Sequence, residues 1–354
     1  MIDLVGWDIG GANVKAAHLQ LEKGEILSLQ VASQPFEIWR ARDQLPRVLQ
    51  SCLAAVSSAL VLVPHAVTMT AELSDVFATK REGVQFVFDS LQAAFPDAPR
   101  YALSLTGQFE PFEAARKHPL DFAAANWVAT ALWLARQFPD CLLVDVGSTT
   151  TDIIPILDGK LAADGHTDRE RLASGELVYT GVLRTNLAAI VQAVPVQGRL
   201  CWVASEYFAI SGDVHLILGH ISPDDYQCPT PDGRPPTPDS ARARLARLVC
   251  ADTEQLSPAE IDTLASHIYH RQIRQIEDGL SQVLSRFPHL AEVPVLALGS
   301  GAFLAAEAAY RLGLKPRSLP LAWNQAASAV APEVAAPCVA AALLLAAALE
   351  ETPE

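Results

Sequence analysis

One pattern of apolar strands and glycine turns occurs twice in this 354-residue sequence. The first copy reads DIGGANVK from Asp8, and the second reads DVGSTTTD from Asp145. The two copies align without gaps, so that Lys15 lies over Asp152. In each copy an apolar strand leads into a glycine turn, a second strand, a tight turn and a third strand. Such self-similarity predicts two related domains that each begin with antiparallel strands.

Helical patterns fill the rest of both halves of the chain. In the second half, Ser257 and Glu260 form a capping box with Pro258 in the first helical position. A helix is predicted from there to Phe287. The first half contains three further helical patterns, at residues 46–60, 81–95 and 121–138. Strands followed by helices, twice over, predict an α/β protein with two similar lobes.

One segment departs from this plan. Residues 223–240 are rich in proline, glycine and aspartate, which predicts a loop rather than a domain boundary, because a helical pattern resumes after it. The loop is either a tolerated surface insertion or a lid over a binding site.

The charge balance limits the classes of ligand. Acidic residues outnumber basic ones by 40 to 26, which gives a net charge of −14. A nucleic-acid-binding protein needs a basic surface, and an anionic membrane repels a chain of this sign, so neither partner is expected. An anionic ligand must therefore be held by a local device, such as glycine amides, one or two cations or a metal ion.

The six scattered cysteines form no CxxC pair, which indicates reduced thiols of a cytoplasmic protein. The N-terminus carries Asp3 and no basic segment, so we expect no signal peptide. The membrane candidate, residues 338–349, is shorter than the ~20 residues that a span needs. A packed helix is predicted there instead.

The two repeated turns have the composition of phosphate-binding loops. Glycine amides can point at a phosphate oxygen because no Cβ blocks the approach. The binding candidates of the first turn are Gly10, Gly11, Asn13 and the charge-neutralising Lys15. Those of the second turn are Gly147, Ser148, Thr149 and Thr150. Plain hairpin turns are the alternative, because glycine and aspartate are common in hairpins.

Three aspartates of the repeats are candidate magnesium ligands, namely Asp8, Asp145 and Asp152. Mg²⁺ usually keeps several waters and binds few carboxylates, so these side chains would hold the ion directly or through water.

A third glycine turn, made by Gly299, Ser300 and Gly301, links a buried-type strand to a helix. A helix N-terminus at such a turn suits an anion or a nucleotide. Close packing of the strand on the helix is the alternative explanation of these glycines.

In this order, the three turns resemble those of the ASKHA superfamily, which contains sugar kinases, actin and Hsp70-type ATPases. DIGGANVK is similar to its first phosphate motif, DVGSTTTD to its second and LGSGAFLA to its adenosine-side motif. AAANWVATA and APCVAAALL fall where that fold has its two connecting helices. The resemblance implies two ribonuclease-H-like lobes of the actin/hexokinase-like ATPase type, with a ligand cleft between them. We expect residues 1–139 and 337–354 in the first lobe and residues 140–336 in the second.

Further stretches resemble a narrower branch, linked to the tetrahydromethanopterin and methanofuran one-carbon pathway. They are residues 68–77, 174–185, 204–219 and 232–252. The characterised activity of that branch is an aryl-ether-forming synthase, which joins γ-glutamyltyramine to the diphosphate ester of an aminomethyl-furanmethanol and releases diphosphate. The resemblance thus implies a transferase of small molecules that uses Mg²⁺ and does not require ATP. It leaves open whether ATP binds and whether the chain forms a homo-oligomer.

The implied reaction needs charge neutralisation at the diphosphate and a base for the phenol proton. A metal ion, a lysine and turn amides supply the first, and Arg184 is a further candidate. A phenol has a reference pKa near ~10, so it needs a base or a late proton transfer. Glu72 and Glu176 are candidate bases, with a surface or capping role as the alternative. Asp152 is a third candidate, for which the metal role competes.

Two other functions fit the same turns. A small-molecule kinase or ATPase would keep phosphoryl transfer from ATP, and Lys15 and Asp152 at matched repeat positions suit that reaction as well. A nucleotide-binding regulator without catalysis would instead move its lobes when the ligand binds. The branch-specific stretches favour the transferase over both.

Overall fold

The computed structural model describes residues 1–57, 62–317 and 335–351 of the chain. Residues 58–60 of one predicted helix, and residues 318–334 and 352–354 of the predicted lobes, lie outside the described residues. Contacts divide the chain into two units. The first contains Met1–Cys141, Ile156–Glu170 and the C-terminal helix, and the second contains Leu142–Pro155 and the long segment that begins at Arg171.

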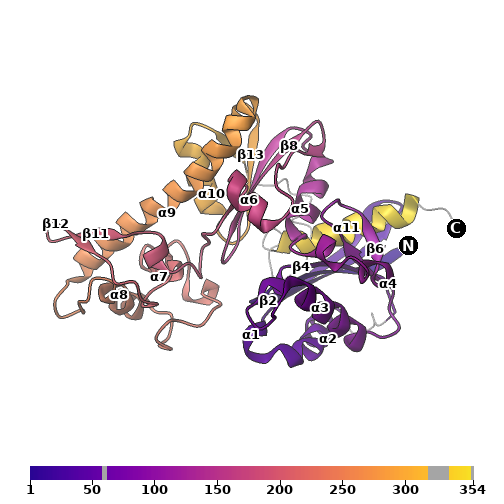
Figure 1. The fold of residues 1–354 in the computed structure, drawn as a ribbon, viewed down its shortest axis with the longest axis horizontal. Helices are drawn as coiled ribbons and strands as arrows, with labels where there is room; N and C mark the ends of the chain where they lie inside the picture. The colour runs from indigo at the N-terminus through magenta and orange to yellow at the C-terminus, as the bar shows by residue number, and fades with distance from the viewer. Residues whose placement is uncertain (58–61, 318–334, 352–354) are drawn as a thin grey trace. The chain divides into compact units, whose positions relative to one another are not determined.

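The first unit is built on a six-stranded sheet with the order β3-β2-β1-β4-β5-β6 (Figure 1). Its strands are β1 (Ile2–Ile9), β2 (Asn13–Glu22), β3 (Glu25–Pro35), β4 (His65–Met69), β5 (Arg100–Leu103) and β6 (Phe109–Pro111). β2 pairs antiparallel with both β1 and β3, β4 pairs parallel with β1, and β5 pairs parallel with β4. The predicted antiparallel start is therefore confirmed.

Helices cover both faces of this sheet (Figure 1). α2 and α3 pack on one face, and α5 and α11 pack on the other. The helical elements are α1 (Ile38–Ala41), η1 (Arg42–Gln44), α2 (Leu45–Val56), η2 (Ala71–Leu73), α3 (Lys80–Ala94), α4 (Phe112–Ala115), η3 (Pro119–Phe122), α5 (Asn126–Ala135) and α11 (Ala336–Glu351). Because both faces are covered, β1 reads as a nearly continuous apolar run.

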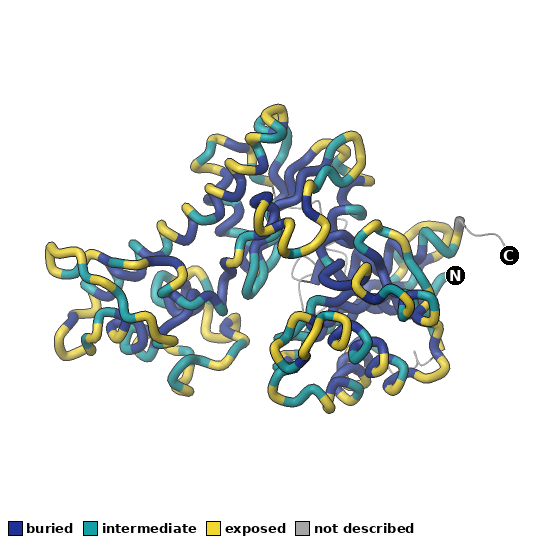
Figure 2. The backbone as a smooth tube through the Cα atoms, in the orientation of Figure 1, coloured by how far each residue is buried: buried dark blue, intermediate teal, exposed yellow. Residues whose placement is uncertain are grey.

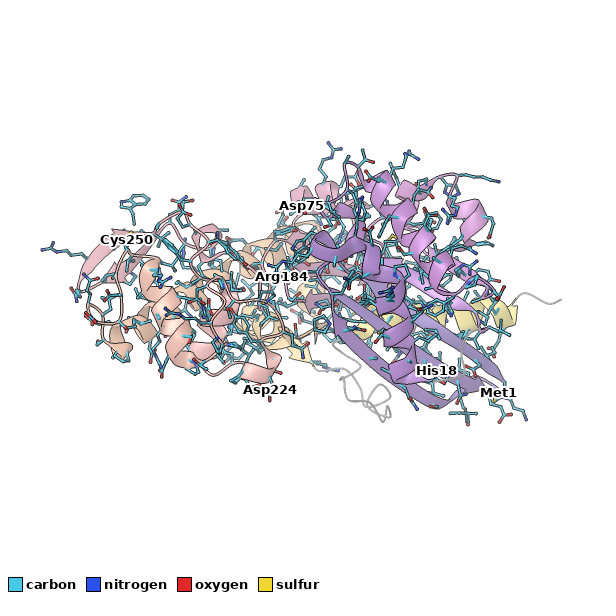
Figure 3. All side chains as sticks on the ribbon, turned by 90° about the horizontal axis from the view of Figure 1, so that it is seen from below. Met1, His18, Asp75, Arg184, Asp224 and Cys250 are labelled. Carbon is cyan, nitrogen blue, oxygen red and sulfur yellow. The ribbon has the colours of Figure 1, made fainter. Side chains whose placement is uncertain are left out.

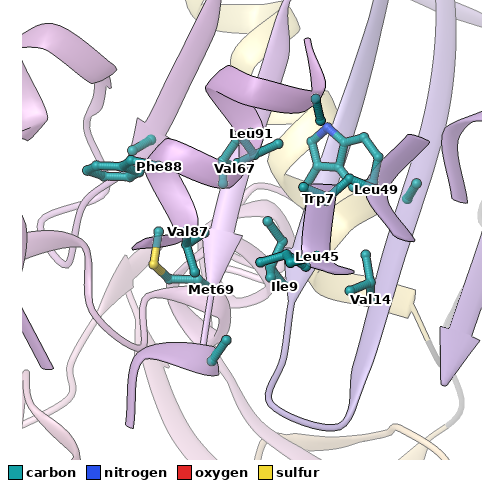
Figure 4. Packing of buried hydrophobic residues seen from close by; sticks show 14 of the residues in the cluster. Trp7, Ile9, Val14, Leu45, Leu49, Val67, Met69, Val87, Phe88 and Leu91 are labelled. Carbon is teal, nitrogen blue, oxygen red and sulfur yellow. The ribbon is translucent and has the colours of Figure 1, made fainter. Parts of the chain in front are cut away.

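Alternate residues of β1 serve the two faces of the sheet. Trp7 and Ile9 are fully buried against α2 and α3, where they meet Leu45 in the main core of the unit (Figure 4). Burial of one such side chain stabilises the fold by about 1.5–3 kcal/mol. On the other face, a Cβ on Gly6 would lie 1.9 Å from the carbonyl oxygen of Cys338 in α11. Glycine at this position therefore lets α11 lie directly on the strand.

α11 is the packed helix that the sequence predicts at residues 338–349. It lies against β1, β2, β4 and α5. Within the described ranges, no helix combines the length and the apolar character that a bilayer span needs.

Two predicted helices are shorter than their sequence patterns indicate. The helix expected at residues 46–60 is α2, which ends where Ser57 adopts an extended backbone. The helix expected at residues 121–138 begins only at Asn126, after η3. Ala124 between them has a left-handed φ of 52°, which interrupts a right-handed helix. α3 confirms the third pattern of the first half.

The second sheet has the order β10-β8-β7-β13-β14, with β9 also paired to β8. Its strands are β7 (Cys141–Val146), β8 (Thr151–Leu157), β9 (Lys160–Leu161), β10 (Leu177–Val178), β13 (Pro294–Leu298) and β14 (Lys315–Arg317). β13 runs parallel to both β7 and β14. The order β8-β7-β13-β14 repeats the order β2-β1-β4-β5 of the first sheet, which confirms two ribonuclease-H-like sheets.

Most remaining elements belong to the second unit. They are α6 (Asp168–Ser174), η4 (Leu187–Ala189), β11 (Ala193–Val196), β12 (Arg199–Trp202), α7 (Ser211–Ile217), η5 (Pro223–Asp225), α8 (Pro238–Arg247), α9 (Pro258–Arg286), η6 (Pro288–Ala291) and α10 (Ala302–Arg311). The long helix α9 confirms the predicted capping box, because Ser257 and Glu260 each cap the other's backbone amide. Buried residues concentrate in the strands and on the inner helix faces, whereas connections are exposed (Figure 2).

The tight turns after the second strands of the repeat also match. Lys23 and Gly24 both have positive φ angles, and so do Asp158 and Gly159. Two successive positive φ angles are the backbone of a type I′ hairpin turn. The third strands differ, since β3 has 11 residues and β9 has 2. The repeat therefore holds through the second strand and its turn.

Residues 223–240 form η5, an irregular segment and the first residues of α8, so the helix starts inside the predicted loop. Buried side chains anchor this loop. Arg244 of α8 is 0% exposed and donates to Asp232 of the loop at 3.0 Å and to Asp213 of α7 at 2.6 Å. The hydroxyl of Tyr226 donates to Asp213 at 3.0 Å. These contacts support the surface-insertion alternative, because a lid needs a weakly held segment.

Candidate functional site

The first glycine turn follows β1, and a charged pair lies at its base. Asp8 and Lys15 face each other across the β1–β2 ladder, with the Nζ atom of Lys15 3.5 Å from Oδ2 of Asp8. The amide of Gly10 donates to the carbonyl of Asn13 at 2.9 Å, which fixes the turn. No atom lies within 4 Å of the position that a Cβ on Gly11 would take. A ligand can therefore approach the backbone at Gly11 closely.

Asp8 has the properties of a ligand to a water-rich magnesium ion. The residue is 6% exposed, and its Oδ1 atom is buried without a hydrogen bond from any described residue. A buried oxygen of this kind needs a water, an N–H group or a cation as its partner. Within the described part of the chain, no three His, Cys, Asp or Glu side chains cluster as metal ligands. A metal ion here would rely on few carboxylates and keep its waters, as Mg²⁺ does.

The second turn is held by the same hydrogen bond as the first. The amide of Gly147 donates to the carbonyl of Thr150 at 2.9 Å, at the positions that the repeat aligns with the first turn. The amide of Arg184 donates to the carbonyl of Ser148 at 2.9 Å. Arg184, labelled in Figure 3, is thus tied through its backbone to the predicted phosphate turn.

The stretch at residues 174–185 packs directly on the second turn. A Cβ on Gly181 would lie 2.5 Å from the backbone of Thr149. The buried Gln272 of α9 donates to the carbonyl of Gly181 at 2.8 Å and to the hydroxyl of Thr180 at 3.1 Å. α9 therefore fixes the segment that covers the turn.

The third turn meets the second one, because β7 and β13 are parallel neighbours and both turns follow their carboxyl ends. The amide of Gly301 donates to the carbonyl of Val146 at 2.9 Å. A Cβ on Gly299 would lie 2.4 Å from Oδ1 of Asp145. Gly299 and Gly301 thus permit a close backbone approach, whereas Ser300 between them is exposed.

Asp152 and Glu176 both have arginine partners. The Nη2 atom of Arg171, which is 1% exposed, donates to Oδ1 of Asp152 at 2.8 Å. Glu176 is fully buried, and the Nη2 atom of Arg286 donates to its Oε1 atom at 2.6 Å. A carboxylate paired with a guanidinium is stabilised in its charged form. Each of these two acids is thus held in place by an arginine.

Glu72 is the candidate base without such a partner. It lies in η2 and is 1% exposed, and neither carboxylate oxygen has a hydrogen bond of ordinary geometry from a described residue. Burial raises the pKa of Glu72 to about 7, and the nearby amides of Glu72 itself and of Ala124 oppose this rise only in part. A carboxyl group with this pKa can accept and release a proton near neutral pH.

Glu72 lies close to the first turn because β4 runs beside β1. The amide of Thr70 donates to the carbonyl of Ile9 at 2.9 Å, at the carboxyl ends of the two parallel strands. Ligands of α/β proteins commonly bind at such an edge. Glu72 follows Thr70 by two residues, so the acid and the first turn share this edge of the sheet.

The predicted residues fall into two groups, one in each unit. The first unit contains Asp8, Gly10, Gly11, Asn13, Lys15 and Glu72. The second unit contains Asp145, Gly147, Ser148, Thr149, Thr150, Asp152, Glu176, Arg184, Gly299, Ser300 and Gly301.

The sequence interpretation missed the charged partners of these residues. Arg171 and Arg286 pair with predicted acids, and Lys80 forms a 3.0 Å ion pair with Asp168 near Glu72. Most of these pairs join positions far apart in the chain. A buried charged residue cannot be told from an exposed one in the sequence, so no motif indicates these ion pairs.

A family model described as hydantoinase/oxoprolinase matches residues 64–340 of the chain. A synthase from Methanocaldococcus jannaschii is 38% identical over 299 residues, which are 84% of this chain and 86% of that protein. Its name describes its product, a furan-2-yl methanamine with a phenoxymethyl group that carries a γ-glutamylaminoethyl substituent. A protein of the same name from Methanococcus vannielii is 41% identical over 160 residues, 45% of this chain and 71% of that protein.

Among solved structures, nucleotide-free acetone carboxylase matches this chain with a TM-score of 0.56. The match covers 96% of this chain and 70% of that one, at 8% sequence identity. An identity this low reports a shared fold and no shared activity.

Proposed function

The chain belongs to the hydantoinase/oxoprolinase family and to the family of the two named synthases, and on that premise we propose that it is an ether-forming transferase. Its substrates are a furfuryl-type diphosphate with an aminomethyl group and γ-glutamyltyramine. The phenol oxygen of the tyramine forms a bond to the methylene carbon of the furan. The bond from that carbon to diphosphate breaks, and diphosphate leaves with the bonding electrons. The extended similarity to the named synthase carries this proposal.

The first turn supports the departure of diphosphate. The backbone at Gly11 is open to a ligand, and Lys15 contributes a positive charge beside it. Mg²⁺, when bound at Asp8, would neutralise further charge on the diphosphate oxygens. In the second unit, we assign the amides of the second turn a phosphate-binding role, and Asp145 would serve as a further carboxylate to hold Mg²⁺. Such groups accelerate the reaction most where charge develops in the transition state.

We assign the phenol proton to Glu72. A phenol with a pKa near ~10 needs a base, and the best base at neutral pH has a pKa close to the working pH. Burial brings the pKa of Glu72 to about 7, whereas Glu176 and Asp152 are engaged by Arg286 and Arg171. The proton moves from the phenol to the Glu72 carboxylate as the carbon–oxygen bond forms.

The first test is an assay of ether formation without ATP. Purified protein is mixed with Mg²⁺, the aminomethyl-furanmethanol diphosphate and γ-glutamyltyramine. Mass spectrometry measures the ether, and a coupled assay measures diphosphate. We expect the two products in equal amounts. If neither product forms, and the protein hydrolyses ATP in a separate incubation with ATP and Mg²⁺, the kinase or ATPase alternative is correct.

A pair of variants tests the assignment of the base. Glu72→Gln should lower kcat by about a hundredfold or more, because the amide cannot accept the proton. Glu176→Gln should mainly lower stability, because Arg286 loses its charged partner, while the folded fraction keeps its rate. Equal loss of kcat in both variants would contradict the assignment.

A further inference from the structure

We infer that Lys80 and Asp168 form a positioning pair for Glu72: the ion pair lies at the start of α3, whose backbone packs against this buried acid, so that loss of either partner alone disturbs Glu72. The inference rests on the proposed function only for its catalytic consequence. Neither residue belongs to the glycine turns or to the predicted site. Both lie in the first unit, as Glu72 does.

The first step concerns the contact between α3 and η2. A Cβ on Gly83 would lie 2.5 Å from the Cα and from the carbonyl oxygen of Glu72. The first turns of α3 therefore lie backbone to backbone against Glu72. Lys80 precedes Gly83 by three residues, and residues three apart are neighbours on a helix surface. This spacing places Lys80 on the side of α3 that faces η2.

The second step concerns the ion pair. The Nζ atom of Lys80 lies 3.0 Å from Oδ2 of Asp168, the first residue of α6. The two side chains are 31% and 19% exposed, so solvent screens them only in part. The ion pair thus joins Lys80 and Asp168 within the first unit.

The third step concerns the sign of each charge at Glu72. The charge of Lys80 lowers the pKa of Glu72, and the charge of Asp168 raises it. The amides of Glu72 itself and of Ala124 also lower this pKa, and neither of these groups titrates. The pair therefore contributes two opposing effects, while burial supplies the main shift. Removal of one partner should leave the effect of the other uncompensated.

The experiment is a direct titration of Glu72 in the protein without substrates. The ¹³C carboxyl signal of Glu72 is followed against pH in protein labelled at glutamate and is assigned by its absence in Glu72→Gln. Lys80→Met should raise the midpoint by roughly half a unit to one unit, and Asp168→Asn should lower it by a similar amount. Lys80→Arg keeps the charge and should restore the original midpoint, so it separates the charge from a general loss of structure.

Lys315→Met serves as the matched control, because Lys315 forms a similar lysine–carboxylate pair with Glu292, 3.3 Å apart, in the second unit. It should leave the midpoint of Glu72 unchanged. Midpoints that stay fixed in Lys80→Met and Asp168→Asn, or that move in the same direction, would overturn the inference.

Activity provides a second and independent readout. If Glu72 is the base, the pH at half-maximal kcat should move with the same signs as the midpoint from NMR. Shifted midpoints in a protein that makes no ether would leave the positioning pair standing and reject the proposed reaction. Ether formation with unshifted midpoints would reject the pair and retain the reaction.

Discussion

At the scale of single residues, the protein treats its buried acids in two ways. Glu176 and Asp152 each receive a hydrogen bond from an arginine, which compensates the charge in a site of low dielectric. Glu72 has no such arginine partner among the described residues, so the effect of burial on its pKa is opposed only in part, by nearby amides and by Lys80. The difference separates acids that organise the structure from an acid that can exchange a proton.

Lys15 is the cation of the first turn, and Lys15→Met removes its charge while it keeps most of the side-chain length. We expect kcat/KM for the diphosphate substrate to fall by about a hundredfold or more, because a group that stabilises developing charge is lost. Lys23→Met is the control, because Lys23 is exposed in the turn that follows β2. A Lys15→Met enzyme with the activity of Lys23→Met would remove the lysine from the site.

Glu72 also makes stability depend on pH. Its pKa is about 7 in the folded state and near 4.5 in the unfolded state. Below pH 4.5 the group is protonated in both states, and above pH 7 it is ionised in both. Between these values folding favours the proton, so the free energy of unfolding falls as pH rises, by about 3 kcal/mol in all.

Urea denaturation of wild type and Glu72→Gln at several pH values measures this effect. The variant should gain stability relative to wild type as pH rises from 4.5 to 7, because glutamine has no charge to bury. A difference between the two proteins that does not vary with pH would show that Glu72 titrates normally.

At this scale, the sequence predicted which residues are candidates for the site, but it did not predict what surrounds them in the fold. Gly10, Lys15 and the aspartates were accessible because they lie within one short repeated motif. Glu72 and Glu176 could not be distinguished, because the difference depends on Arg286, which lies 110 positions from Glu176. Burial of Glu72 likewise arises from α3 and from the Ala124 turn, which the local sequence does not reveal.

At the scale of elements, the ends of β7 and β13 act as one structure through Gly299. A Cβ there meets both Asp145 and the Val146 carbonyl, so Gly299→Ala should displace the second turn and lower kcat/KM by tenfold or more. Gly313→Ala is the matched control, because Gly313 also has a positive φ. Gly299 lies just before α10 and Gly313 just after it, but a Cβ on Gly313 would meet open space.

Both substitutions impose the strain of a positive φ, which costs about 1 kcal/mol. The difference between their activities in the ether assay therefore measures only the effect of the close contact between residue 299 and the second turn. Equal activities would mean that the contact with Asp145 has no part in the reaction.

Helices α7 and α8 depend on a buried ion pair in a similar way. Arg244→Met leaves the fully buried Asp213 without its cation, and we expect a loss of about 3–5 kcal/mol in the free energy of unfolding. Arg242→Met is the control on the same helix. Arg242 pairs with the exposed Asp239 and the partly exposed Asp262, so its loss should stay below about 1 kcal/mol. Denaturant titration distinguishes the two, and a small loss in Arg244→Met would contradict the anchoring role.

Sequence patterns predicted elements well where the signal is local. The capping box before α9 and the type I′ turns use neighbouring residues, so they were readable in advance. The break before α5 was not, because the alanine-rich run that contains Ala124 favours a helix by itself. Tertiary contacts select the left-handed conformation there, against the local preference.

At the scale of the whole molecule, the net charge of −14 opposes an anionic substrate. The Debye length falls from about 30 Å to about 8 Å between 10 mM and 150 mM salt. We expect the KM for the diphosphate substrate to decrease a few-fold over this range, because the repulsion is screened before the short contacts in the site are. The KM for γ-glutamyltyramine, whose glutamyl group carries one charge of each sign, should change little. A KM for the diphosphate that rises with salt would indicate a dominant positive field at the site.

Two copies of one strand order, each followed by helices, could be inferred for the whole chain because the repeat covers the start of each sheet. The composition of each unit could not be inferred to the same detail. The first unit takes in Ile156–Glu170 from the middle of the chain. Such assignments depend on contacts between distant segments, which periodicity does not encode.

The contact between Gly6 and α11 joins two segments that leave the ribosome at very different times during synthesis. β1 emerges first, whereas the helix that covers its second face emerges nearly a full chain length later. At about 5–20 residues per second, tens of seconds separate the two events. Throughout that interval one apolar face of the first sheet is not yet covered by α11, and exposed apolar surface of this kind is bound by chaperones.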